Sequence, residues 1–292
     1  MNVFLPNLLA VLSQASTLFL IAAGLNLVFG LLRVINVTQG SFYMYGAFLA
    51  TTLIGVGSTE GSINLLWIIP AALIVAVLGS AEEMTIVRPL YKRDHLTQLL
   101  TTYGAFLILD DLAIKFWGTQ QRSVTFSGLL GSTITVGRSG IPVAELIIIA
   151  AALAIGITFW WIVGRTHLGQ KLRALAQDRE LLSLMGVNVR RMYTAVFAAS
   201  AGVAALTGGL AILTQSIGQG LDTSILVDAF LVAVIGGLGS TTGAALGALL
   251  IAAVQQLAVG LAPSLESYAL YAAMLCVLVV RPTGLLGRQR AV

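Results

Sequence analysis

The chain has 292 residues, of which 58% are hydrophobic and 10% are charged. Soluble domains carry about 25% charged residues, so this composition excludes a water-soluble globular protein. A mean hydropathy of +0.95 also excludes a disordered chain, which needs low hydrophobicity and high net charge. In a membrane protein, the positions of the basic residues that give the net charge of +4 indicate which loops lie on the cytoplasmic side. We therefore predict an all-α, polytopic integral membrane bundle surrounded by lipid, with no nucleic-acid partner.

Stretches that are nearly free of charged residues predict the membrane spans. A hydrocarbon core of about 30 Å requires about 20 helical residues. Stretches near this length lie at residues 1–32, 34–59, 61–81, 95–117, 146–164, 192–221, 229–265 and 267–281. No repeat and no long Pro/Gly linker divides the chain, so we predict one transmembrane domain, 1–292, with about eight spans. No Lys or Arg precedes Arg33, so the first stretch lacks the basic start of a cleavable signal peptide and is expected to remain.

The stretch 229–265 is too long for one span. Its 37 residues would reach about 55 Å as a single helix. Gly236-Gly-Leu-Gly-Ser-Thr-Thr-Gly243 offers glycines for a turn and hydroxyl groups for the freed backbone groups. We predict a break near 236–243, either between two spans or within a re-entrant hairpin. The last stretch is expected to end at Arg281-Pro282, because proline cannot continue a helix.

Basic residues predict the orientation, because short cytoplasmic loops carry most Lys and Arg. They form three groups: Arg88, Lys92 and Arg93; Arg165, Lys171, Arg173, Arg179, Arg190 and Arg191; Arg281, Arg288 and Arg290. The loop 165–191 and the C-terminus are therefore expected in the cytoplasm. The N-terminus, residues 118–140 and the segments around Glu60 and Asp222 are expected on the outer, periplasmic side.

The chain lacks the motifs of several enzyme classes. No G-x-x-x-x-G-K-[ST] loop is present, so the chain is not expected to bind ATP itself. It has no H-E-x-x-H or G-x-S-x-G motif and a single cysteine, Cys276, so we predict no catalytic residue, no cysteine metal cluster and no disulfide within the chain. An ion-coupled carrier needs a titratable residue in a span, and Asp228 is the main candidate. The alternative is that Asp228 lies in the first turn of its helix, where a carboxylate suits the helix dipole.

Polar side chains in the first two predicted spans are candidates for a transport pathway. They are Asn26, Asn36, Gln39 and Tyr43. A polar group buried in a membrane must be hydrogen-bonded, either to the protein or to a passing solute. The alternative is hydrogen bonding between helices, with glycines that allow close approach.

Several segments together resemble one family. Glu180-Leu-Leu-x-x-x-Gly186 has the spacing of the E-A-A-x-x-x-G loop of ABC importer permeases. The wider match comprises Gly24–Gly30, Arg33–Gly40, Gly169–Asp178, Leu184–Asn188, Gly236–Ser240 and Arg281–Gly287. This ordered set, from about residue 20 to residue 287, resembles the Liv-type permease subunits of high-affinity branched-chain amino-acid ABC importers.

The resemblance implies a multi-pass subunit of the bacterial inner membrane. It also implies a second, related permease subunit, two cytoplasmic ABC ATPases that bind ATP and Mg²⁺, and a periplasmic substrate-binding protein. The chain itself would be a transport subunit without enzyme activity and without a cofactor or metal of its own. By position, the segment from about Ala174 to Gly186 in loop 165–191 would be the coupling helix that docks on an ATPase. Its contact residues would be Ala174, Asp178, Glu180, Leu181, Met185 and Gly186.

The resemblance implies leucine, isoleucine, valine or related hydrophobic amino acids as substrates. Two alternatives stay open from the sequence. One is a permease of the same family for urea or short amides. The other is a self-sufficient ion-coupled carrier that uses Asp228.

Overall fold

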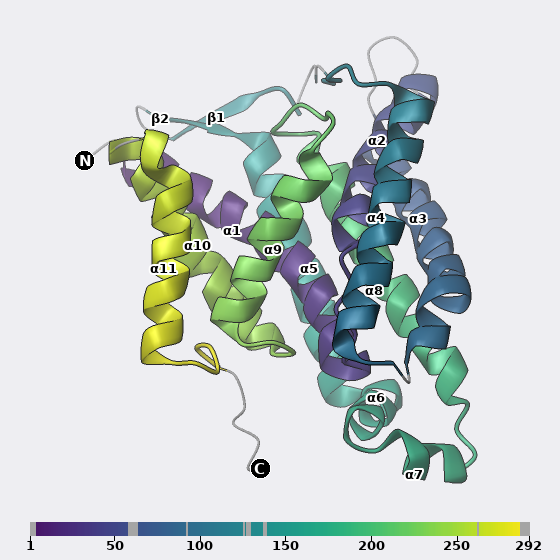
Figure 1. The fold of residues 1–292 in the computed structure, drawn as a ribbon. Helices are drawn as coiled ribbons and strands as arrows, with labels where there is room; N and C mark the ends of the chain where they lie inside the picture. The colour runs from purple at the N-terminus through teal and green to yellow at the C-terminus, as the bar shows by residue number, and fades with distance from the viewer. Residues whose placement is uncertain are drawn as a thin grey trace.

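A computed structural model describes residues 4–57, 64–91, 93–124, 126, 130–136, 139–261 and 263–286. The structure is almost entirely helical, and the predicted all-α polytopic bundle is confirmed (Figure 1). The helices are α1 (Phe4–Leu32), α2 (Gln39–Gly57), α3 (Ile68–Glu82), α4 (His95–Trp117), α5 (Val143–Arg165), α6 (His167–Gln177), α7 (Arg179–Leu184), α8 (Val189–Ala211), α9 (Leu221–Gly236), α10 (Thr241–Leu261) and α11 (Glu266–Val280). One antiparallel hairpin, β1 (Thr133–Val136) and β2 (Ser139–Pro142), pairs Ile134 with Ile141.

Six helical segments among the described residues are long and apolar enough to cross a membrane. They are Pro6–Leu32, Leu65–Leu90, Val143–Arg165, Val189–Ala211, Thr241–Leu261 and Pro263–Val280. Helices α2, α4 and α9 run beside them (Figure 1). α2 has 19 residues and α9 has 16. Their first turns meet, because an added Cβ at Gly40 would overlap the carbonyl oxygen of Asp222.

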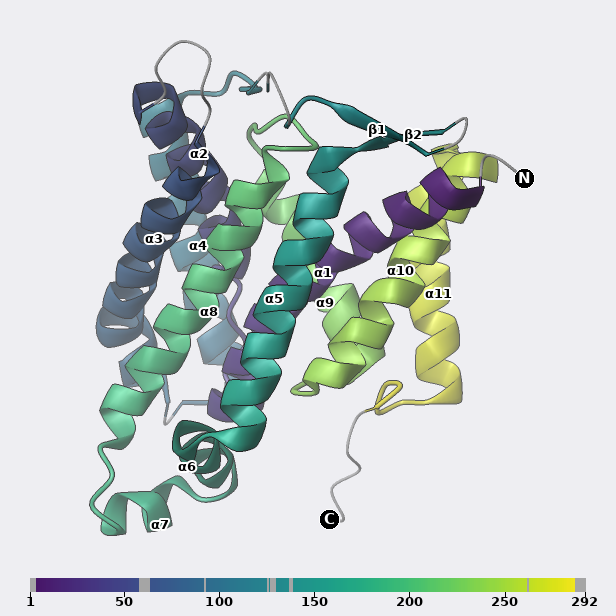
Figure 2. The same ribbon diagram turned by 180° about the vertical axis from the view of Figure 1, so that it is seen from behind.

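Helix α8 packs closely against α2 and α3 through glycines. Gly46 on α2 lies against the backbone of Ala205, and Gly208 on α8 lies against the backbone of Tyr43. Gly79 on α3 faces the methyl group of Ala201. Because a Cβ at any of these glycines would overlap its neighbour, the small residues set how closely the helices approach. By contrast, α11 lies at the edge of the bundle beside α10 (Figures 1 and 2).

The chain between α1 and α2 corrects one sequence prediction. Residues 34–59 were predicted as one continuous span, but residues 33–38 are not helical and α2 begins only at Gln39. Arg33 has a φ of 57°, which turns the chain out of α1. Asn36 and Thr38 are fully buried. Non-helical backbone at membrane depth is tolerated where protein buries it, and here the bundle does so.

The predicted break near residues 236–243 is confirmed. α9 ends at Gly236 and α10 begins at Thr241, and both arms are helical. Gly237 and Gly239 have φ values of 101° and 83°, which favour glycine. The turn lies at the same end of the bundle as the C-terminal ends of α1 and α11 (Figures 1 and 2). α11 ends at Val280, directly before Arg281-Pro282, as predicted.

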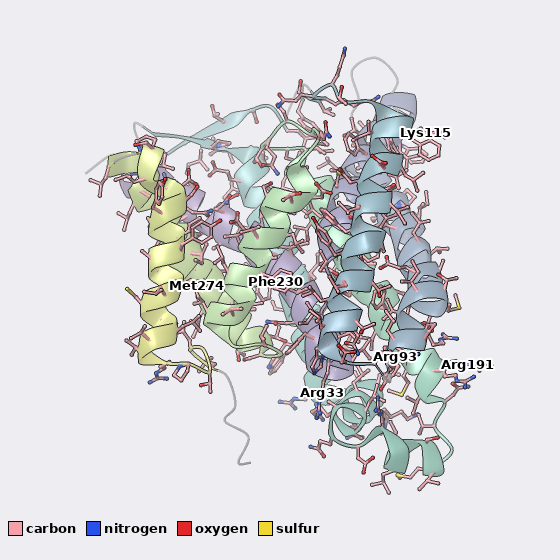
Figure 3. The ribbon with its side chains drawn as sticks, viewed as in Figure 1. Arg33, Arg93, Lys115, Arg191, Phe230 and Met274 are labelled. Carbon is pink, nitrogen blue, oxygen red and sulfur yellow. The ribbon has the colours of Figure 1, made fainter. Side chains whose placement is uncertain are left out.

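Basic side chains gather at one end of the molecule. Arg33, Arg93 and Arg191 lie at the end that also carries α6 and α7, whereas Lys115 lies at the opposite end with the hairpin (Figure 3). The predicted outward segment around Glu60 and the basic residues Lys92, Arg288 and Arg290 lie outside the described residues. The two ends of the bundle therefore differ in charge, as the positive-inside rule requires of a membrane protein.

Candidate functional site

The segment from Arg165 to Arg191 forms a separate helical layer at the basic end. Thr166 begins it, because its hydroxyl group accepts a hydrogen bond from the Gly169 backbone N–H at 3.2 Å. An added Cβ at Gly169 would overlap the carbonyl oxygens of Ile162 and Val163, so only glycine permits this sharp corner between α5 and α6. Leu175 and Leu182 are buried and anchor the layer to the bundle.

The segment from about Ala174 to Gly186, predicted to be one coupling helix, is two helices. α6 ends at Gln177 and α7 begins at Arg179. Asp178 between them has an extended backbone, and its carboxylate accepts a hydrogen bond from the Leu181 N–H at 3.0 Å. An Asp that caps a helix in this way competes with continuous helix. Gly186 ends the segment with a φ of 80°.

The predicted contact residues of this layer differ in exposure. Leu181 is 57% exposed and Met185 is 72% exposed, while Leu184, which was not predicted as a contact, is 85% exposed. Ala174 is half-buried on α6. Glu180 lies in α7, but its side chain lies outside the described part of the structure. Three neighbouring apolar side chains thus project from α7 and the residue that follows it, which is typical of a protein contact surface.

Inside the bundle, Gln39 and Tyr43 join α2 to other parts of the chain. The Gln39 amide nitrogen donates to the Ser200 carbonyl oxygen at 3.2 Å, and the Ser200 hydroxyl lies 3.0 Å from the Gln39 amide oxygen and 2.7 Å from the Gly24 carbonyl oxygen. The hydroxyl of Tyr43, which is fully buried, accepts from the Gln215 amide at 2.8 Å. The contacts of Gln39 support the interhelical alternative, whereas Tyr43 joins α2 to the loop that follows α8, where Gln215 lies.

Asn26 on α1 caps the turn between α9 and α10. Its amide nitrogen donates to the Ser240 carbonyl oxygen at 3.2 Å, and its amide oxygen accepts from the Gly239 N–H at 3.2 Å. Gly30, one turn further along α1, lies so close to Gly239 that an added Cβ would be 2.9 Å from its Cα. Asn26 is therefore a structural anchor of the break.

Asn36 forms part of a buried cluster with Thr38 and Glu82 of α3. The Asn36 amide oxygen accepts from the Thr38 N–H at 3.1 Å, and the Thr38 hydroxyl lies 2.6 Å from that oxygen and 2.8 Å from Glu82 Oε1. A hydroxyl group has one hydrogen, so it cannot donate to both oxygens at once. Both contacts are favourable when Glu82 carries a proton and donates to Thr38. The cluster thus fits a neutral carboxylic acid.

Glu83, the next residue along the chain, connects this region to the start of α8. It begins a π-helical turn over Glu83–Val87 and forms an ion pair with Arg88 at 2.8 Å. Thr194 of α8 donates to Glu83 at 2.7 Å and accepts from Arg88 at 2.8 Å. Glu83 thus joins the end of α3 to α8, and Glu82 joins α3 to the non-helical segment 33–38. Sequence reasoning missed both residues, although an acidic pair at the end of an apolar stretch was a visible signal.

Asp228 lies in the middle of α9, which corrects the alternative that placed it in a first turn. The first turn of α9 holds Asp222 instead, which is fully buried although its segment was expected outside. Asp228 is half-buried. Helices α1 and α10 are joined by Gln255, whose amide oxygen accepts from the Gln14 amide nitrogen at 3.3 Å.

The structure does not gather the predicted pathway residues into one site. Asn26 lies at the turn after α9, Asn36 lies beside Glu82, and Gln39 lies against Ser200. Each has partners within the protein. The element that the structure presents at its surface is the layer of α6 and α7, anchored to the bundle by the buried Leu175 and Leu182.

Comparison with known proteins assigns the family. The family model described as "Branched-chain amino acid transport system / permease component" matches residues 7–279. The chain is 28% identical to the high-affinity branched-chain amino acid transport system permease protein BraD of Pseudomonas aeruginosa, over 98% of this chain and 96% of that protein. It is 29% identical to the LivH protein of Escherichia coli, with the same coverage. A probable LivH of Methanocaldococcus jannaschii is 25% identical over 89% of this chain and 80% of that protein. Because the family model spans nearly the whole bundle, this integral membrane protein belongs to the branched-chain amino acid transport system permease component family.

Proposed function

We propose that this chain is a transmembrane permease subunit of an ATP-driven ABC importer for branched-chain or related hydrophobic amino acids. The match to the family over residues 7–279 carries the proposal. In the complete importer this chain pairs with a second permease subunit in the inner membrane and receives substrate from a periplasmic binding protein. Two cytoplasmic ATPases bind ATP and Mg²⁺. The chain itself forms the path for the substrate.

The layer of α6 and α7 supports a docking role for residues 165–191. Its exposed apolar triad, Leu181, Leu184 and Met185, suits insertion into a groove of an ATPase, because buried apolar anchors contribute most of the energy of such contacts. Motion of the ATPases then reaches the bundle as a rigid-body movement of this layer. The ion pair between Glu83 and Arg88 and their bonds to Thr194 provide a rigid connection to α3.

The charge asymmetry supports an orientation with α6, α7 and the C-terminus in the cytoplasm and the start of α1 in the periplasm. Labelling with a membrane-impermeant thiol reagent tests it. In a Cys276→Ser background, exposed Gln120→Cys should react in intact spheroplasts, and exposed Arg179→Cys should react only after permeabilisation. The reverse pattern would overturn the orientation.

The function is tested by purifying the chain from its native membrane with its bound partners. We expect ATPase subunits to copurify, and leucine-loaded binding protein to stimulate ATP hydrolysis. Leu184→Asp should weaken copurification of the ATPases about tenfold, since it places a charge in the docking surface while leaving the buried Leu182 in place. The matched control is Ile134→Asp on the hairpin at the opposite end, which is also exposed and should retain the ATPases.

The same preparation separates the alternatives. Stimulation by urea-loaded but not leucine-loaded binding protein would support the amide permease. If the chain alone moves leucine into liposomes under an ion gradient, and Asp228→Asn abolishes that movement, the carrier alternative replaces the importer.

A further inference from the structure

A second feature of the basic end is a pocket of about 480 Å³ between the end of α3 and the start of α8. Ser80, Met84 and Arg88 line one wall, and Arg191, Ala195 and Ala198 belong to the other. The pocket lies apart from the exposed face of α7. None of the polar residues considered for the transport pathway lines it.

Three guanidinium groups give the pocket its charge. Arg88 is held in place by Glu83 and Thr194, each at 2.8 Å. Arg190 also lines the pocket, and Arg190 and Arg191 are exposed. Within the described ranges the one ion pair is that of Arg88 with Glu83, so the other two guanidinium groups bring uncompensated positive charge. Figure 3 shows Arg191 projecting at the lower outer edge of the bundle.

The wall formed by α3 changes from apolar to basic along its length. Leu73, Val77 and Ser80 share one face of α3 by their spacing, and Met84 and Arg88, in the π-helical and 3-10 turns that continue α3, line the pocket together with Ser80. Leu73 is 63% exposed and Val77 is 68% exposed, and both lie within the segment Leu65–Leu90 that is apolar enough to span a membrane. This exposed apolar face therefore contacts lipid tails and leads to a guanidinium group.

The wall formed by α8 has the same polarity. Arg191, Ala195 and Ala198 follow a similar spacing along α8 and lead to Gly202. A Cβ added at Gly202 would lie 3.5 Å from the methyl group of Ala76 on α3, so the two helices approach closely there. Small side chains thus line a shallow seam above the charged end. Both helix faces are apolar toward the membrane interior and basic at the membrane surface, which matches the polarity of a phospholipid.

We propose that this pocket binds an anionic glycerophospholipid of the inner leaflet, with its phosphate between Arg88, Arg190 and Arg191 and one acyl chain along the seam of α3 and α8. Basic pockets between membrane helices at the cytoplasmic surface attract anionic headgroups. Arginine suits this role because its planar group donates two parallel hydrogen bonds to a phosphate. The apolar half of the pocket favours a lipid over a soluble phosphate. A bound lipid would join α3 to the helix that follows α7.

Native mass spectrometry of the full chain with its copurifying partners, in detergent micelles, tests the site. Phosphatidylglycerol is titrated against phosphatidylcholine with the same acyl chains. We expect one phosphatidylglycerol per chain, retained at least tenfold more strongly than phosphatidylcholine. The double variant Arg190→Gln/Arg191→Gln should lose about tenfold in this affinity. The matched control, Lys171→Gln/Arg179→Gln, removes two exposed basic residues of the same end outside the pocket and should bind normally.

A second variant separates a lipid from a free phosphate. Ala195→Trp fills the apolar half of the pocket and keeps all three guanidinium groups, so it should weaken the binding of phosphatidylglycerol. In the unsubstituted protein, inorganic phosphate at millimolar concentration should not displace phosphatidylglycerol. Equal binding of both lipids, or normal binding by the arginine double variant, would overturn the proposal. Displacement of lipid by inorganic phosphate would assign a soluble anion instead. If the double variant keeps phosphatidylglycerol but loses the ATPases, the arginines belong to a protein interface and the lipid site is wrong.

Discussion

The two interruptions of helix in this bundle, between α9 and α10 and between α1 and α2, are supported by different kinds of contact. The turn between α9 and α10 satisfies its backbone groups mainly with its own residues: the Ser240 N–H donates to the Gly237 carbonyl oxygen at 3.0 Å, and the Gly243 N–H donates to the Ser240 hydroxyl at 3.0 Å. The non-helical segment 33–38 combines local bonds between Asn36 and Thr38 with contacts to distant helices. Glu82 of α3 meets Thr38, and the Thr102 hydroxyl of α4 lies 3.2 Å from the Ile35 carbonyl oxygen, beside the closer carbonyl oxygens of Gln98 and Leu99 in its own helix.

This difference shows where the information for a break resides. A break that closes on itself needs glycines and hydroxyl groups within a few residues, so it is visible locally in a sequence. A break that is supported by other helices needs only a buried polar partner elsewhere in the chain. The turn between α9 and α10 should therefore be sensitive to added side-chain atoms at its glycines, and segment 33–38 to the loss of hydrogen-bonding groups.

The largest effect is expected from Gly236→Ala at the local break. An added Cβ would overlap the carbonyl group of Gly243, which is backbone and cannot rotate away. Overpacking of this kind costs about 3 kcal/mol, and the Tm in detergent should fall by about 10 °C. The control is Gly104→Ala on α4, where an added Cβ meets nothing within 4 Å and helix propensity favours alanine. Equal Tm values for the two variants would show that the close approach of α9 and α10 is not required.

Asn26→Leu tests one distant support of the same break; a second is the C-terminal segment, where the Leu285 and Leu286 N–H groups donate to the Ile235 and Gly236 carbonyl oxygens. The change removes a donor and an acceptor and leaves the Gly239 N–H and the Ser240 carbonyl oxygen without their partner from α1. Burial without a partner costs about 1–3 kcal/mol, so the Tm should fall less than in Gly236→Ala. Asn7→Leu, an exposed position on the same helix, should leave the Tm unchanged. A matching loss in both variants would mean that the cap has no specific effect.

The contrast also explains which parts of the fold were predictable. Charge-free stretches predicted most helices because the membrane selects for them, and Arg281-Pro282 marked the end of α11. Val34-Ile-Asn-Val-Thr38 read as part of a span, because its β-branched, apolar residues carry no local stop signal. Its non-helical backbone contacts Glu82 and Thr102, which are far away in sequence.

The candidate site shows the same limit. The spacing from Glu180 to Gly186 predicted where the surface layer ends, and Gly186 does adopt the left-handed conformation. The carboxylate of Asp178, which was predicted as a contact residue, caps α7 and divides the layer. An Asp within a helical pattern is compatible with a continuous helix or with a cap, so the sequence did not predict this division.

Glu82→Gln and Glu82→Leu test the distant support of segment 33–38. If Glu82 is a neutral acid, glutamine replaces it well, because its amide nitrogen also donates to the Thr38 hydroxyl. Glu82→Gln should therefore retain the wild-type Tm, and Glu82→Leu should lose about 1 kcal/mol, because the Thr38 hydroxyl then keeps only its bond to Asn36. The two variants serve as controls for each other, since both remove the possibility of a charge. A glutamine variant as unstable as the leucine variant would contradict a proton on Glu82.

The smallest effect is expected where segment 33–38 begins. Arg33 is the one residue other than glycine with a positive φ among the described residues, and a left-handed conformation costs an L-residue about 1 kcal/mol. Arg33→Gly removes that strain and loses only a long hydrogen bond, 3.4 Å, to the Ala176 carbonyl oxygen. The Tm should stay level or rise by about 2 °C, whereas Arg93→Gly, at the same end without a positive φ, should lower it slightly. A clear loss of Tm in Arg33→Gly alone would mean that its contact with α6 outweighs the backbone strain, and that the distant break is also anchored by the surface layer.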